Sequence, residues 1–142
     1  MLKEIHDHIT SELNQGAKTD TIFVITAIVF NLIVLGVNSG IAGSASDPYN
    51  RDTLSQDIIL VVFTVLLLLV NTISITALTV GKKTRQKLIS GLMRMYKDNE
   101  VDKYYDSELL GNYNVRYTLF TAVIVCLGIT AILVPLIIRL VN

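Results

Sequence analysis

Three long apolar stretches that contain no charged residue constrain this chain more than any other feature. They cover residues 21–41, 58–80 and 117–138. As helices they would each be about 30 to 35 Å long, which matches the roughly 30 Å hydrocarbon core of a bilayer. A buried helix of a soluble protein needs a polar face, and these stretches carry only narrow polar stripes. We therefore predict an all-α integral membrane protein with three transmembrane helices.

The composition agrees with a membrane protein that forms a single domain over residues 1–142. The apolar fraction is 51% and the mean hydropathy is +0.55, both high for a soluble domain. The formal net charge is zero, so we expect no nucleic-acid partner. Cys126 is the only cysteine, which excludes an intramolecular disulfide.

The distribution of basic residues predicts the orientation. Of the 12 lysines and arginines, all but Arg51 and Arg139 precede the first stretch or lie between the second and third. Cytoplasmic segments hold the excess of basic residues, so we expect a cytoplasmic N-terminus and an outer C-terminus. The segment of residues 42–57 would then be an outer hairpin. Four tyrosines near the start of the third stretch are typical of anchors at headgroup level: Tyr104, Tyr105, Tyr113 and Tyr117.

A separate amphipathic helix is predicted at about residues 2–15. Its apolar residues recur at spacings of three and four, which gives a narrow stripe for a membrane surface or a partner. Gln15 and Gly16 then offer a stop before the first span, because glycine commonly follows the last residue of a helix. The stripe consists of Leu2, Ile5, Ile9 and Leu13.

A basic helix at about residues 82–97 should continue the second span into the cytoplasm, since Gly81 alone is a weak breaker. Its apolar side needs a partner: the lipid boundary, the N-terminal helix, or the same helix of another subunit. Its basic cluster could contact anionic lipid, or could serve only as the orientation signal. The cluster consists of Lys82, Lys83, Arg85 and Lys87.

The sequence carries no recognisable catalytic motif, so we predict neither an enzyme nor a cofactor. The glycines form no phosphate-binding loop, and the spans hold no carboxylate pair. His6 and His8 are two residues apart, so on a helix they point in different directions and should not share a metal ion.

Neutral polar and small residues inside the spans are the candidate functional positions. The polar side chains can form hydrogen bonds between helices, or can line a water-filled path in a ring of subunits. The small residues and a proline are candidates for close helix packing. Pro135 also removes a helix hydrogen bond, which favours a kink. The polar candidates are Asn31, Asn38, Thr64, Asn71 and Ser74, and the packing candidates are Gly36, Gly40, Gly128 and Pro135.

These features lead to two hypotheses for function. The first is a homo-oligomeric membrane assembly, with a pore or ion channel as its activity, because three helices alone are too few to enclose a pore. The alternative is a non-conducting accessory or scaffold subunit of a larger membrane complex. In that case the N-terminal helix and the basic helix would bind another membrane protein.

Overall fold

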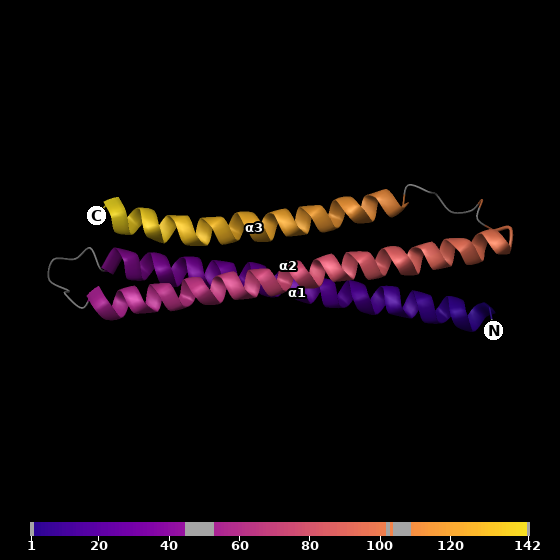
Figure 1. The fold of residues 1–142 in the computed structure, drawn as a ribbon, viewed down its shortest axis with the longest axis horizontal. Coiled ribbons are helices and arrows are strands. Elements are labelled where there is room, and N and C mark those ends of the chain that lie inside the picture. The colour runs from indigo at the N-terminus through magenta and orange to yellow at the C-terminus, as the bar shows by residue number, and fades with distance from the viewer. Residues whose placement is uncertain (1, 45–52, 102, 104–108, 142) are drawn as a thin grey trace.

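The computed structural model consists of three long helices that lie side by side (Figure 1). It describes residues 2–44, 53–101, 103 and 109–141. The helices are α1 (Leu2–Ser44), α2 (Thr53–Asp98) and α3 (Leu109–Val141). The start of α1, the end of α2 and the start of α3 lie at one end of the bundle, which we call the amino end. The chain therefore reverses direction at each connection.

All three helices are long and apolar enough to cross a membrane, as the sequence predicted. They contain 43, 46 and 33 residues, which correspond to about 65, 70 and 50 Å. A bilayer core of about 30 Å covers less than two thirds of each. The excess of α1 and α2 lies at the amino end, where residues 2–20 and 81–98 extend beyond the apolar stretches.

The predicted break after residue 15 is wrong, because α1 runs without interruption from Leu2 to Ser44. Gly16 is helical, and no described glycine has a positive φ, so none forms a left-handed cap here. A glycine inside a helix costs only about 1 kcal/mol. Packing of the first half of α1 against α2 can offset that cost. Helix α2 likewise continues through Gly81, so residues 82–97 belong to it.

The buried face of α1 follows a heptad pattern. From Asp20 to Asn38 its buried residues alternate between spacings of four and three, which is the pattern of helices that pack along a left-handed seam, and a further spacing of four leads to Ala42. Helix α1 packs against both α2 and α3, which contact each other less extensively. The buried residues of α1 are Asp20, Val24, Ala27, Asn31, Val34, Asn38 and Ala42.

Two apolar clusters form the core, and a polar layer separates them. The cluster nearer the amino end contains Val24, Ala27, Leu78, Tyr117 and Ile124. The other contains Val34, Leu67 and Ala131. Asn31 and Asn71 lie between these clusters in sequence on α1 and α2.

The extensions of α1 and α2 contact each other at the amino end. The His6 ring and the buried Tyr96 hydroxyl are 2.9 Å apart, and their ring centroids are 5.9 Å apart. The N-terminal part of α1, one of the three partners considered for the basic helix, contacts it here. Helix α2 then ends in a Schellman motif, with Glu100 in the left-handed region at φ 59° and Val101 N–H donating to the Tyr96 carbonyl.

Side-chain bonds tie α3 to α2 near both ends. The Gln86 amide donates to Asn114 at 2.7 Å, and Arg139 bonds Asp57 at 3.0 Å. The centre of the predicted outer hairpin, with Arg51, lies outside the described residues, as do Tyr104 and Tyr105. Helix α3 continues past Pro135 to Val141.

Candidate functional site

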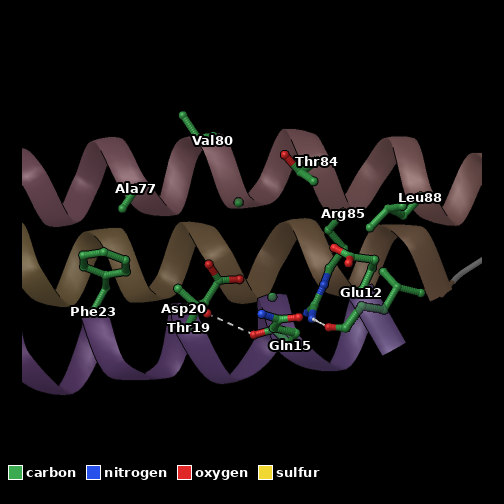
Figure 2. Close-up of a pocket in the computed structure, with 13 residues that line it drawn as sticks. Glu12, Gln15, Thr19, Asp20, Phe23, Ala77, Val80, Thr84, Arg85 and Leu88 are labelled. Carbon is green, nitrogen blue, oxygen red and sulfur yellow. Dashed lines mark hydrogen bonds between the residues drawn. The ribbon is translucent and has the colours of Figure 1, made fainter. Parts of the chain in front are cut away.

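A pocket of about 470 Å³ lies between α1 and α2 at the level where the apolar stretches begin (Figure 2). Figure 2 shows Phe23 and Ala77 at one end and Glu12 and Leu88 at the other. The apolar end is therefore the one nearer the membrane-spanning parts of the helices. The polar side chains between and beyond them are Glu12, Gln15, Thr19, Asp20, Thr84 and Arg85.

Asp20 is a buried carboxylate on the wall of this pocket, with 8% of the residue exposed. Its Oδ2 accepts a hydrogen bond from the Tyr117 hydroxyl on α3. A Cβ at Gly81 would lie 2.4 Å from the Asp20 Oδ1, so only glycine leaves room for the carboxylate there. All three helices therefore shape the surroundings of Asp20.

Tyr117 is not the lipid-facing anchor that the sequence suggested. Only 5% of it is exposed, and its hydroxyl is used by Asp20. The side chain of Tyr113 is outside the described part. A tyrosine at this level can anchor a helix to headgroups only if its ring faces lipid.

Arg85, one of the predicted lipid contacts, turns toward α1. Its Nη2 donates to the Leu13 carbonyl at 2.8 Å, and its side chain is half-buried. Together with Asp20, Arg116 and Tyr117 it also lines a much smaller cavity between the helices. The other predicted lipid contacts keep outward positions, with Lys83 and Lys87 exposed and Lys82 half-buried.

The Asp20 carboxylate has no ion pair within the described part of the chain. It accepts a hydrogen bond from Tyr117, and the ion pairs in this part of the chain are His6–Asp7 and Arg139–Asp57. Arg116 lies over the Phe120 ring, 5.2 Å from its centroid. A buried charge without an ion pair is costly, so a buried carboxylate at the edge of an apolar stretch is a candidate functional residue.

A second polar feature is the amide pair of Asn31 and Asn71, deep inside the bundle. Asn31 Nδ2 donates to Asn71 Oδ1 at 2.7 Å, and Asn71 Nδ2 donates to Asn31 Oδ1 at 3.0 Å. Asn31 also bonds the Ala27 carbonyl at 2.6 Å. The two residues are 1% and 9% exposed, so they lie within one protomer and not on its outer surface.

Gly128 of α3 packs directly against the amide pair of α1 and α2. A Cβ at this position would lie 2.5 Å from Asn71 Nδ2 and 3.4 Å from Asn31 Oδ1. Of the predicted packing residues, Gly128 and the buried Pro135 therefore act inside the protomer. Gly36 and Gly40 do not, because they are exposed and a Cβ on either would meet nothing within 4 Å.

The remaining polar candidates are placed separately. Ser74 is buried, and half-buried Thr64 donates to the Leu60 carbonyl of its own helix at 2.8 Å. Asn38 is 1% exposed, and its Oδ1 has no hydrogen-bond partner. The structure thus joins Asn31 with Asn71, but leaves Asn38 outside this pair.

The described residues contain no cluster of three or more His, Cys, Asp and Glu side chains that could hold a metal ion. The candidates chosen from the sequence did not include Asp20. One signal in the sequence could have identified it. Asp20 directly precedes the first apolar stretch, Gly81 directly follows the second, and Tyr117 begins the third. Because successive helices run in opposite directions, these three positions lie at the same depth in the bundle.

The close fit of Gly128 predicts unequal effects of two glycine substitutions. Gly128→Ala should lower the free energy of unfolding by about 1 to 3 kcal/mol, because the new methyl displaces the Asn71 amide. Gly36→Ala should be neutral or stabilising by up to about 1 kcal/mol, because its Cβ meets open space. Thermal unfolding of both variants in one mild detergent measures the difference. Equal effects would contradict the packing of α3 on the amide pair.

Comparison of the chain with family models, with curated proteins and with solved structures gave no match in any of the three.

Proposed function

We propose that this chain is a non-conducting accessory or scaffold subunit of a membrane assembly. The observation that carries the proposal is the closed amide pair of Asn31 and Asn71 against Gly128. In a ring-shaped pore the polar residues of each subunit must face a shared axis. These two amides bond each other and are buried inside one protomer, so they are not available to line a path shared with neighbouring copies.

The outer surface of the spans supports the same proposal. Large apolar side chains cover much of it, including Ile33, Leu68 and Ile129 at 52 to 53% exposed. Exposed Gly36 and Gly40 leave a place where another membrane helix can approach α1 closely. The occupant of this face is either a second copy of the chain, which would make a homo-oligomer, or another membrane protein.

We also propose that the amino end of the bundle is cytoplasmic. The support is the bias of the lysines and arginines, which places nearly all of them at the amino end or in the chain leading to it. In this orientation the extensions of α1 and α2 would rise from the cytoplasmic face as a helical stalk. Exposed Lys83 and Lys87 on that stalk would lie near anionic headgroups.

Labelling of single cysteines tests this orientation. We expect an impermeant maleimide to label Ser44→Cys but not Ser90→Cys in intact cells, in a Cys126→Ala background. Both serines are exposed at helical positions, one near each end of the bundle. Permeabilised cells, in which both positions should react, provide the control. Labelling of position 90 alone in intact cells would reverse the proposed orientation.

A pore is the second candidate, and one observation favours it. Thr72, Thr76 and Thr79 are exposed on one face of α2, and the same face continues to Lys83 and Lys87. A ring of copies that turned this face inward would have a hydroxyl-lined path with a basic mouth. The threonine hydroxyls, however, already donate to carbonyls of their own helix at 2.7 to 2.8 Å, as is suitable for residues that face lipid.

Ion flux separates the two candidates. We expect liposomes that contain the purified protein to pass small cations and anions no faster than protein-free liposomes, at several voltages. Flux in the wild type that falls in Thr76→Leu, while the oligomeric mass stays the same, would establish the pore instead. Thr130→Leu on α3 is the matched control, because Thr130 is also exposed and bonds its own helix.

A further inference from the structure

We propose that the pocket between α1 and α2 binds an amphiphile with a primary ammonium headgroup. The ammonium would bind at Asp20, and the hydrocarbon tail would lie toward Phe23 and Ala77. The inference is independent of whether the protein conducts ions. It rests on the charge, the shape and the depth of the pocket.

The charge of the pocket favours a cation. Two carboxylates, those of Glu12 and Asp20, line it together with one guanidinium, that of Arg85. Arg85 donates to the Leu13 carbonyl, and the ion pairs within the described residues join other side chains than Arg85 and Asp20. Asp20 is more than nine-tenths buried, yet within the described chain its bonding partner is the neutral Tyr117 hydroxyl. An ammonium group beside the carboxylate would give it the direct ion pair that neither Arg85 nor Arg116 forms with it in the described chain, although both line a small cavity with Asp20.

The free oxygen of Asp20 is the one that a ligand would reach. Tyr117 bonds Oδ2 from α3, whereas Oδ1 faces Gly81 on α2. Because Gly81 has no side chain, the carboxylate can pack against α2 and still line the pocket. Thr19 and Gln15 also line the pocket on the same helix as Asp20. The Thr19 hydroxyl and the Gln15 amide oxygen are groups of the kind that accept N–H bonds from a primary ammonium.

The shape of the pocket favours an amphiphile over a bare cation. Its volume of about 470 Å³ is within the usual range for small-molecule sites, and far exceeds the need of a single ammonium ion. Phe23 and Ala77 give one end an apolar wall, while Glu12 and Arg85 lie toward the other end (Figure 2). The apolar end is the one nearer the predicted bilayer. Head and tail would therefore lie in the same order as in a membrane leaflet.

Two sources could supply this chemistry: a lipid with an ethanolamine headgroup, or a free alkylamine. Both present a primary ammonium on an apolar chain. Choline lipids differ because their quaternary nitrogen has no N–H donor.

Calorimetric titration with octylammonium tests the proposal. The protein is held in nanodiscs of phosphatidylcholine and phosphatidylglycerol, and octanol serves as the uncharged control. We expect saturable binding of octylammonium and at least about tenfold weaker binding by Asp20→Asn, which keeps the shape but removes the charge. Asp98→Asn, an exposed carboxylate at the same end of the bundle, should bind like the wild type.

A second variant keeps the test decisive if Asp20→Asn does not fold. Ala77→Phe retains the carboxylate and fills the apolar end, so it should bind methylammonium as the wild type does but lose octylammonium. Equal octylammonium affinity in wild type, Asp20→Asn and Ala77→Phe would overturn the proposal, as would saturable binding of octanol at the same affinity.

Adding phosphatidylethanolamine to the nanodiscs identifies the source of the ammonium group. Competition with octylammonium would indicate the lipid, and unchanged affinity would indicate a free amine.

Discussion

The reciprocal amide bonds between Asn31 and Asn71 are the interaction on which the rest of this structure depends. In a bilayer the hydrophobic effect does not hold helices together, because lipid tails are as apolar as the side chains. Association must come from close packing and from polar groups that lose their bonds if the helices separate. The amide pair supplies such bonds between α1 and α2. Gly128 lets α3 approach the same point, so one layer fixes the register of all three helices.

The second constraint is the length of the helices. Helices α1 and α2 are too long for a bilayer core, and their excess lies at the same end of the bundle. The His6–Tyr96 and Arg85–Leu13 contacts join these extensions, so α1 need not end at Gly16. At the junction between spans and extensions, Asp20, Gly81 and Tyr117 meet. The proposed ammonium site is therefore located where the polar and apolar parts of the molecule join.

Much of the fold could be predicted from the sequence, because charge-free stretches of bilayer length have few alternatives. The continuity of α2 through Gly81 was also accessible, since one glycine costs little. The continuity of α1 was not, because it depends on packing against residues more than seventy positions away. The candidate site could not be predicted for the same reason: the pattern of one helix does not show which residue bonds Asp20 or which helix Asn71 faces. Asn31 and Asn71 were recognised as candidates, but only the packed bundle pairs them with each other.

A double-mutant cycle on Asn31→Ala and Asn71→Ala tests whether these amides bond each other within one protomer. The free energies of unfolding of wild type, both single variants and the double variant would be measured in bicelles at two protein concentrations. If the two amides bond in this way, we expect at both concentrations a coupling energy between about 0.6 kcal/mol, the average for hydrogen bonds between membrane helices, and about 1.7 kcal/mol, the largest such value. Strictly additive effects, or a coupling that appears only at the higher protein concentration, would contradict this bonding within one protomer. The second result would place the bonds between copies of the chain instead.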